Sequence, residues 1–300
     1  MKNDRGLVTD ICQVKALFFR DVWSKLTVPV RPGLEGLDLY REQMNRFARK
    51  HVLVLGATPE LVDMALQLGA ARVVSIERNP EIMAAMRQLG EEDWSDVEMI
   101  AGNWLEKQSE FHAAFNCIVC DGGLLFMEFP GQWERLFALV YDYLLPGGVF
   151  VAKEWAEPPG PREYETVKLE LIRIFEQQCP GMDDEQAAQA FSRLVSELRL
   201  AAFIGLTCED GSFAQEPLVA RLDALIEELE QRFPDSELVA MTHAALRYLA
   251  RSQPGTTDTV AGVRYKGAER LLYRQGLQCQ EHPLPDAPLQ GGNYMFVAIK

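Results

Sequence analysis

Two apolar runs separated by an amphipathic stretch form the clearest pattern in the chain. The first run, 52–55, breaks at Gly56, and the second run, 73–76, ends on Glu77. Continuous apolar runs of this length predict parallel strands that are buried on both faces. Between them, residues 59–68 carry apolar positions at helical spacing. The pattern therefore predicts a strand, a helix and a second strand.

The predicted helix has favourable residues at both ends. Thr58 is a preferred N-cap, Pro59 suits the first helical position, and Gly69 ends the helix. In the same way, Asn79 precedes Pro80 at the start of the next predicted helix. A glycine turn followed 21 positions later by an acid is typical of a nucleotide-binding β-α-β unit. There the glycine lets the backbone approach the ligand, and the acid accepts hydrogen bonds from ribose hydroxyls.

The alternation of helices and strands continues through the first half of the chain. Helices are predicted at 80–90 and 132–144, and strands at 97–101, 115–120 and 149–153. The first half therefore contains five predicted strands.

The pattern between residues 156 and 259 is helical and shows no convincing strand. Its candidate helices are 162–178, 184–204, 217–232 and 236–250. A periodic segment of about 100 residues is too long for a loop. We expect an all-helical insertion that either caps the active site and selects the acceptor or forms a dimer interface.

The strand and helix rhythm resumes near the C-terminus. A helix is predicted at 262–275 and strands at 277–282 and 293–299, with the loop PLPDAPLQGG between the two strands. A hairpin is the natural interpretation, and it makes the last strand antiparallel.

Composition narrows the choice of partners. The 300 residues include 30 basic and 44 acidic side chains, a formal net charge of −14. This charge disfavours nucleic acid and anionic membranes as partners. No signal-peptide pattern and no uninterrupted apolar run of transmembrane length is visible, so we expect a soluble, cytoplasmic protein.

The six cysteines give no metal-binding pattern. Cys117 and Cys120 form a C-x-x-C, but they lie in a predicted strand. Positions three apart on a strand face opposite sides, so the two thiols cannot bind one metal ion. We expect buried thiols and no metal site.

Several stretches together resemble the class I S-adenosylmethionine-dependent methyltransferases. They are VLVLGATPE, VVSIERNPEIMAAM, IAGNW, FNCIVCDGG and LLPGGVFVAKEW. The resemblance implies an α/β fold: a seven-stranded, mostly parallel, doubly wound sheet with an antiparallel last strand. It divides the chain into an N-terminal helical lid, 1–50, a cofactor-binding domain, 51–155 and 260–300, and the helical insertion, 156–259.

The resemblance also implies S-adenosylmethionine as cofactor. The backbone of Leu55, Gly56 and Ala57 would pass under its methionine part. Glu77, with Arg78 beside it, would hold the ribose hydroxyls.

Four further residues receive cofactor roles from the same resemblance. Asn103 would bond the adenine amine, and Trp104 would lie close to the adenine ring. Asp121 and Gly122 would lie near the sulfonium and its methyl group.

The glycine loop departs from the family pattern. Val54 stands where an acid is usual, and Thr58 and Glu60 replace the second and third glycines. An anionic Glu60 at a helix N-terminus would repel pyrophosphate and compete for the same N–H groups. This counts against NAD and FAD, but not against S-adenosylmethionine, which has no phosphate.

Methyl transfer is an in-line displacement at an activated carbon, so alignment and desolvation supply much of the acceleration. A base is needed for a hydroxyl or protonated amine acceptor. Asp121 and Glu154 are candidates at the predicted sheet edge, and His243 is a candidate from the insertion. His243 also fits an ordinary helix histidine.

Aromatic and basic residues could line the acceptor and cofactor sites. Phe126 and Trp155 follow strand ends, where they would serve either an acceptor pocket or the core. Trp23, Arg31 and Tyr40 could form a lid, with Arg31 pairing with the methionine carboxylate. A helix packed on the sheet edge is the alternative.

The sequence therefore predicts a methyltransferase with a small-molecule acceptor and a possible homodimer. The fourth strand exits through Asp-Gly-Gly-Leu, not the Asn/Asp-Pro-Pro-aromatic run of many enzymes that methylate amino groups of DNA or protein. A non-catalytic adenosyl-binding or partner-regulating protein is the main alternative. An aminopropyltransferase and a nicotinamide-dependent oxidoreductase are further alternatives.

Overall fold

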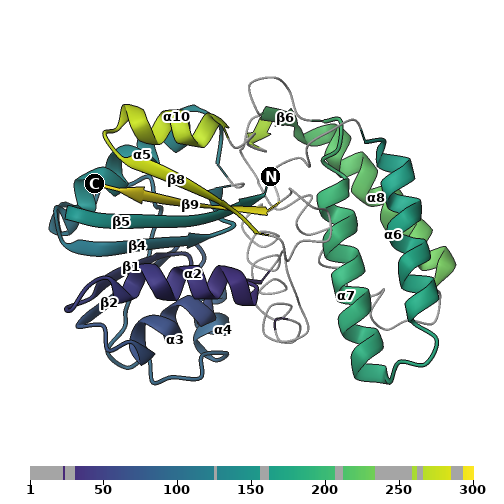
Figure 1. Ribbon diagram of the computed structural model, residues 1–300, viewed down its shortest axis with the longest axis horizontal. Helices are drawn as coiled ribbons and strands as arrows, with labels where there is room; N and C mark the ends of the chain where they lie inside the picture. The colour runs from purple at the N-terminus through teal and green to yellow at the C-terminus, as the bar shows by residue number, and fades with distance from the viewer. Residues whose placement is uncertain are drawn as a thin grey trace, which may run out of the picture.

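A computed structural model of the protein describes residues 23, 31–124, 127–155, 162–206, 212–233, 259–261, 266–284 and 293–300. Figure 1 shows a twisted sheet with helices on both faces and a block of helices beside it.

The main sheet has seven strands in the order β3-β2-β1-β4-β5-β9-β8. They are β1 (His51–Leu55), β2 (Arg72–Glu77), β3 (Glu98–Ala101), β4 (Phe115–Asp121), β5 (Leu144–Trp155), β8 (Gln278–Pro283) and β9 (Asn293–Ile299). The pairs among β1 to β5 are parallel, and β9 runs antiparallel to both β5 and β8. This confirms the predicted seven-stranded α/β sheet with an antiparallel last strand.

Helices cover both faces of this sheet (Figure 1). They are α2 (Leu34–Asn45), α3 (Pro59–Gln67) and α4 (Pro80–Arg87) on one face, and α5 (Gly131–Tyr143) and α10 (Lys266–Arg274) on the other; a short 3-10 helix, η2 (Ser109–Phe111), precedes β4. Val52 and Val54 of β1 pack with Tyr40 of α2, whereas Leu53 packs with Phe137 of α5. Successive strand residues point to opposite faces. The apolar run of β1 therefore contributes side chains to the core on the α2 face and to the core on the α5 face.

The C-x-x-C pair of β4 follows the same alternation. Cys117 belongs to the core on the α2 face, and Cys120 belongs to the core on the α5 face. Both thiols are buried, and burial raises the pKa of Cys117 to about 12. The two cysteines therefore face away from each other, as the alternation predicts.

Two predicted helix caps have different outcomes. Asn79 caps α4, because its side-chain oxygen accepts hydrogen bonds from the N–H groups of Glu81 and Ile82. Thr58 occupies the N-cap position of α3, but its side chain makes no capping hydrogen bond. The prediction of Thr58 as a side-chain cap was wrong in this respect. Pro59 still supplies a first helical residue that needs no partner for an N–H group.

The insertion has a core of its own. Its described helices are α6 (Tyr164–Gln178), α7 (Asp184–Ala201) and α8 (Gln215–Arg232). The rings of Phe175, Phe191 and Phe233 meet edge to face within this core. A capping box between Asp183 and Gln186 begins α7. Three of the predicted helices of the insertion are thus present, and the fourth, 236–250, lies outside the described residues.

The prediction that the insertion contains no strand was wrong. Strands β6 (Ser212–Ala214) and β7 (Thr259–Ala261) pair in an antiparallel two-stranded sheet. Three residues are too few to show an alternating pattern, and the partners lie far apart in sequence.

None of the helices that the structure describes is long and apolar enough to cross a bilayer.

Asp63 of α3 holds the loop that precedes β3. Its carboxylate accepts hydrogen bonds from the N–H groups of Glu91 and Glu92 at 2.8 and 3.2 Å and from the indole N–H of Trp94 at 2.6 Å. Asp63 is buried, and so is Trp94. A β-carbon at Gly90 would lie 2.6 Å from the Trp94 ring. This corner of the fold therefore depends on one buried carboxylate.

We expect Asp63→Ala to lower the free energy of unfolding by about 2–3 kcal/mol, because two backbone N–H groups and the buried indole N–H of Trp94 lose a charged acceptor. Urea denaturation followed by circular dichroism measures this loss. Asp38 is an exposed carboxylate paired with Arg41 of the same helix. Asp38→Ala is therefore the control and should cost less than about 0.5 kcal/mol. Equal losses in the two variants would contradict the structural role of Asp63.

Candidate functional site

The carboxyl ends of β1, β2, β4 and β5 meet at one edge of the sheet. Because β2 lies on one side of β1 and β4 on the other, the crevice beyond β1 is a topological switch point. Open α/β sheets bind ligands at such points. Leu55, Gly56, Glu77 and Asp121 all stand at strand ends along this edge. Gly122 follows Asp121 and donates its N–H to the carbonyl of Lys153 in β5.

Hydrogen bonds from β2 hold the turn after β1. Gly56 has a φ angle of 108°, in the left-handed region that favours glycine. Its N–H donates to the carbonyl of Ile76 at 2.8 Å, and the Ser75 hydroxyl donates to the Gly56 carbonyl at 2.8 Å. Ser75 is fully buried. A buried serine therefore fixes the backbone between the buried residues Leu55 and Ala57.

The indole of Trp104 lies over this turn. Its Nε1 donates to the carbonyl of Ile76 at 2.8 Å. A β-carbon would lie 3.6 Å from the ring at Gly56 and 2.4 Å from it at Gly123. The ring therefore lies between the turns after β1 and β4, and it fits there only because residue 123 is glycine.

Glu77 and Asn103 are half-buried at the ends of β2 and β3. Glu77 Oε1 accepts a hydrogen bond from the N–H of Asn79 at 2.9 Å. The side-chain oxygen of Asn103 accepts one from the N–H of Leu105 at 3.0 Å. Arg78 is exposed. The carboxylate and the amide thus stand at neighbouring strand ends, as the sequence predicts.

Asp121 and Lys153 form a buried ion pair at the ends of β4 and β5. The two residues are register partners. Lys153 Nζ lies 2.9 Å from Asp121 Oδ2, and the side chains are 1% and 2% exposed. Burial raises the pKa of the Asp121 carboxyl, and the charge of Lys153 opposes this rise. The candidate catalytic carboxylate is therefore held by a buried cation.

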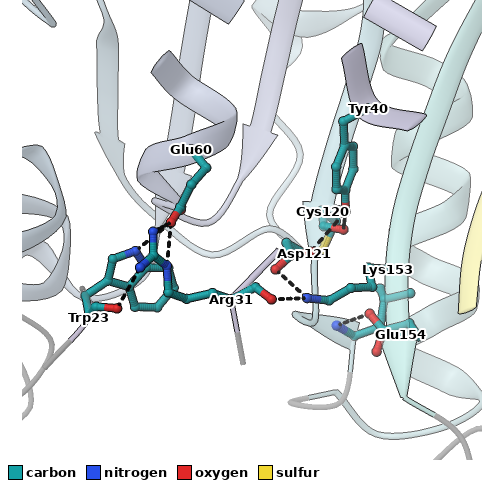
Figure 2. A network of polar contacts seen from close by, with 9 residues as sticks. Trp23, Arg31, Tyr40, Glu60, Cys120, Asp121, Lys153 and Glu154 are labelled. Atoms are coloured by element: carbon teal, nitrogen blue, oxygen red, sulfur yellow. Dashed lines mark hydrogen bonds and ion pairs between the residues drawn. The ribbon is translucent and has the colours of Figure 1, made fainter. Parts of the chain in front are cut away.

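Tyr40 approaches this pair from α2 (Figure 2). Its hydroxyl donates to the carbonyl of Cys120 at 2.8 Å and lies 3.3 Å from Asp121 Oδ1. The side chain is fully buried. Burial, and then the nearby charge of Asp121, raise the pKa of Tyr40 well above its ordinary value. Tyr40 therefore acts as a neutral donor beneath the site.

Arg31 spans the edge from β5 to α3, as Figure 2 shows. Its Nε and Nη2 atoms both contact Oε1 of Glu60, at 2.8 and 2.6 Å. Its Nη1 donates to the carbonyl of Trp23 at 3.2 Å, and the indole N–H of Trp23 donates to the same Glu60 oxygen at 3.0 Å. The Arg31 carbonyl accepts a hydrogen bond from Lys153 at 3.3 Å. One residue thus joins the first turn of α3 to the buried ion pair.

Glu154 follows Lys153 but points to the other face of the sheet, because consecutive strand residues alternate. It is 2% exposed, and its Oε1 accepts a hydrogen bond from the N–H of Leu124 at 3.0 Å. Phe126 and His243 lie outside the described residues. Only the backbone of Trp155 is described, as the last residue of β5. The structure thus brings Asp121 into contact with Tyr40 and Lys153, whereas the Glu154 carboxylate contacts Leu124.

Sequence reasoning missed Lys153 and Ser75. Lys153 interrupts an otherwise apolar strand, and a charged residue near a strand's carboxyl end is a signal that could have found it. Ser75 gave no comparable signal, because one small polar residue is common in a strand. The contact of Glu60 with Arg31 was also not predicted.

No known family model matches the sequence, and no curated protein is significantly similar to it. Among solved structures, a Rhodobacter sphaeroides protein described as a Zn-dependent alcohol dehydrogenase is 16% identical, with a TM-score of 0.56 over 96% of this chain and 98% of that chain. An S-adenosylmethionine-dependent methyltransferase from Mesorhizobium loti is 12% identical, with a TM-score of 0.50 over 88% of this chain and 96% of that chain. A Burkholderia thailandensis 1,6-didemethyltoxoflavin-N1-methyltransferase, solved with S-adenosylhomocysteine, is 12% identical, with a TM-score of 0.48 over 100% and 92% of the two chains.

Identities of this size establish a shared fold and leave activity to other arguments. The sheet order, with its inserted antiparallel β9, agrees with the fold that the sequence resemblance implies. The likeness to the Mesorhizobium loti protein supports the same assignment. The chain therefore has the Rossmann-like fold of the class I S-adenosylmethionine-dependent methyltransferases.

Proposed function

We propose that the protein is an S-adenosylmethionine-dependent methyltransferase that acts on a small-molecule acceptor. One observation carries the proposal: the Gly56 turn and the Glu77 carboxylate stand at adjacent strand ends, at the switch point of the sheet. A glycine with a left-handed backbone allows close approach of a ligand, and an acid at this place suits ribose hydroxyls. Leu55, Ala57, Arg78 and Asn103 complete the proposed cofactor contacts.

An adenosyl group would enter the crevice once the Trp104 indole moves. The ring lies against Gly56 and Gly123, at the turns after β1 and β4, where the cofactor would pass. Only one hydrogen bond of the indole, to Ile76, is replaced when the ring leaves. Trp104 would then stack on the adenine. Adenine itself would lie beside Asn103 at the end of β3, as the resemblance implies.

S-adenosylmethionine would supply a methyl group on a positively charged sulfur. The chain's own contribution would be alignment and exclusion of water. Asp121 and Gly122 would lie near the sulfonium and its methyl group. A carboxylate there would accept the acceptor's proton, and Lys153 would keep that carboxylate ionised. Glu154 and His243 are weaker candidates for the same role.

We assign acceptor selection to the insertion, with Phe126 and Trp155 lining the pocket. In Figure 1 the helices α6 to α8 stand beside the carboxyl edge of the sheet, where strand loops bind ligands. The net charge of −14 favours a metabolite over nucleic acid or membrane lipid. We further propose a cytoplasmic protein; a homodimer interface is the alternative role of the insertion.

A non-catalytic adenosyl-binding protein is the second candidate. The specific observation in its favour is the Trp104 indole over the Gly56 turn, which keeps the crevice filled. S-adenosylhomocysteine binding without any methyl transfer to a library of metabolites would favour this candidate.

We expect S-adenosylhomocysteine, at 100 times its dissociation constant, to stabilise the protein by about 2.7 kcal/mol, whereas NAD should have no effect. Glu77→Ala should weaken binding by about 1–3 kcal/mol, because charge-assisted hydrogen bonds to the ribose are lost. Thermal shift and calorimetry measure both effects. Glu106→Ala removes an exposed acid nearby and should leave the affinity unchanged. Stabilisation by NAD alone would refute the proposal.

Ligand binding should change the fluorescence of Trp104, because the indole must leave the Gly56 turn. The change should disappear in Trp104→Phe and persist in Trp94→Phe, which alters a tryptophan bound to Asp63. Titration with S-adenosylhomocysteine under tryptophan excitation measures it. A full response in Trp104→Phe would show that the ring does not move.

We expect Lys153→Met to destabilise the protein by about 3–5 kcal/mol at neutral pH, because it leaves Asp121 buried and unpaired. Without Lys153 the pKa of Asp121 rises further. The folded variant then holds the Asp121 proton to a higher pH than the folded parent does. Between the Asp121 pKa of the parent and that of the variant, the loss of stability caused by Lys153→Met should therefore grow as pH rises. Urea denaturation at several pH values measures this dependence.

A double variant controls for the charge. Lys153→Met with Asp121→Asn removes both charges and should recover most of the stability, while methyl transfer stays low. Lys107→Met breaks an exposed pair with Asp142 and should cost less than about 1 kcal/mol. A Lys153→Met loss that does not depend on pH would contradict the assigned ion pair.

A further inference from the structure

A cavity of about 280 Å³ lies among α2, α3 and the loop that follows α4. Leu37 of α2, Met64 of α3 and Leu89 of the loop each form part of its lining. None of the residues that we propose as cofactor contacts lines it. Its volume is close to the lower end of the range for small-molecule sites, about 300 Å³. The cavity is therefore a second candidate site, apart from the crevice at the carboxyl edge of the sheet.

Part of the lining is apolar and comes from two separate clusters. Leu37 and Met64 belong to the apolar cluster that also contains Tyr40. Trp23 and Leu89 belong to a smaller cluster. The cavity lies where the two clusters meet, so the hydrocarbon part of a ligand would be removed from water on both sides.

The charged part of the lining is more acidic than basic. The two guanidiniums of the lining already have carboxylate partners: Arg31 lies 2.6 Å from Glu60, and Arg41 lies 2.7 Å from Asp38. An anionic ligand would have to displace one of these partners. A cationic ligand would instead meet an excess of negative charge. The acids that line the cavity are Glu60, Asp63 and Glu91.

Glu60 has an acceptor oxygen that the described residues leave without a donor. The Arg31 guanidinium and the Trp23 indole N–H all contact Oε1 (Figure 2). The other oxygen, Oε2, is buried and receives no hydrogen bond from the described part of the chain. A buried acceptor without a donor is unfavourable. Rotation about the broad terminal torsion of the side chain would turn Oε2 toward a donor in the cavity.

We propose that this cavity binds a small protonated amine with an apolar body, at a site separate from the cofactor crevice. The ammonium group contacts Glu60 and the acids beside it, and the apolar body contacts Leu37, Met64 and Leu89. Arg31 marks the boundary between the two sites. Its guanidinium lines the cavity, whereas its carbonyl accepts a hydrogen bond from Lys153.

Calorimetry with matched probes tests the class of ligand. Phenethylamine carries a positive charge at neutral pH. Phenethyl alcohol and phenylacetate have a similar skeleton without that charge, and ethylamine lacks the apolar body. We expect phenethylamine to bind at least about tenfold more tightly than each of the other three, because only phenethylamine combines a charge-assisted contact with apolar burial. Equal or tighter binding of any of the other three would overturn the proposal.

Variants of the lining locate the bound amine. Leu37→Trp fills the cavity without a change of charge and should weaken phenethylamine binding at least about tenfold. Leu34→Trp, at a position of the same helix that is 82% exposed, is the control and should leave the affinity unchanged. An unchanged affinity in Leu37→Trp would place the amine elsewhere and overturn the proposal.

Charge variants test the role of the acids. Glu60→Gln should reduce the preference for phenethylamine over phenethyl alcohol to less than about threefold. Because Glu60→Gln also alters the Arg31 pair, Glu91→Gln provides a second test at an exposed residue of the lining, and it should lower the amine affinity about threefold. Glu35→Gln, at an exposed acid of α2 outside the lining, is the control. A full preference for the amine in both lining variants would contradict the acidic site.

Competition separates the cavity from the crevice. Phenethylamine should bind protein saturated with S-adenosylhomocysteine within about twofold of its affinity for the free protein, because the two sites are distinct. Displacement of the amine by S-adenosylhomocysteine would place it in the crevice and overturn the proposal. If S-adenosylhomocysteine itself does not bind, the proposed function fails, and Leu37→Trp still decides whether the amine occupies the cavity.

Discussion

Burial of both faces of the central strand governs the architecture of this protein. β1 lies between two parallel neighbours and packs against helices on either side. Its side chains from Val52 to Leu55 are therefore apolar, and the polar groups of the site lie beyond its carboxyl end. Because β2 and β4 run parallel to β1, their ends open at the same edge. The candidate site occupies the place where apolar packing stops.

The polar groups at that edge are held by contacts from distant parts of the chain. Asp121 is fixed by Lys153 from β5 and by Tyr40 from α2. A buried ion pair of this kind adds little net stability, because desolvation offsets the attraction between the charges. Its position at the ligand edge favours a role in chemistry over a role in stability. Hydrogen bonds from the rest of the fold make that arrangement specific.

The two ends of the crevice differ in chemistry. Toward β2 and β3 it offers an indole, a half-buried carboxylate and an amide, which suit a nucleoside. Toward α3 it offers a guanidinium and a carboxylate already paired with each other. In the described structure Trp104 lies over the Gly56 turn at one end, and Arg31 and Glu60 pair with each other at the other.

The sequence by itself determined the sheet and much of its edge. Apolar runs gave the strands of the main sheet, Gly56 gave the turn after β1, and Glu77 could be placed at the end of β2. These features follow from local periodicity and from backbone preferences, which neighbouring residues encode.

Only the tertiary structure decided which side chains meet. Lys153 joins Asp121 across 32 positions, Arg31 joins Glu60 across 29, and Trp104 reaches the carbonyl of Ile76 across 28. The short strands β6 and β7 likewise form only because they pair with each other. Such contacts depend on register and on the packing of helices over the sheet edge, and local periodicity carries no information about either.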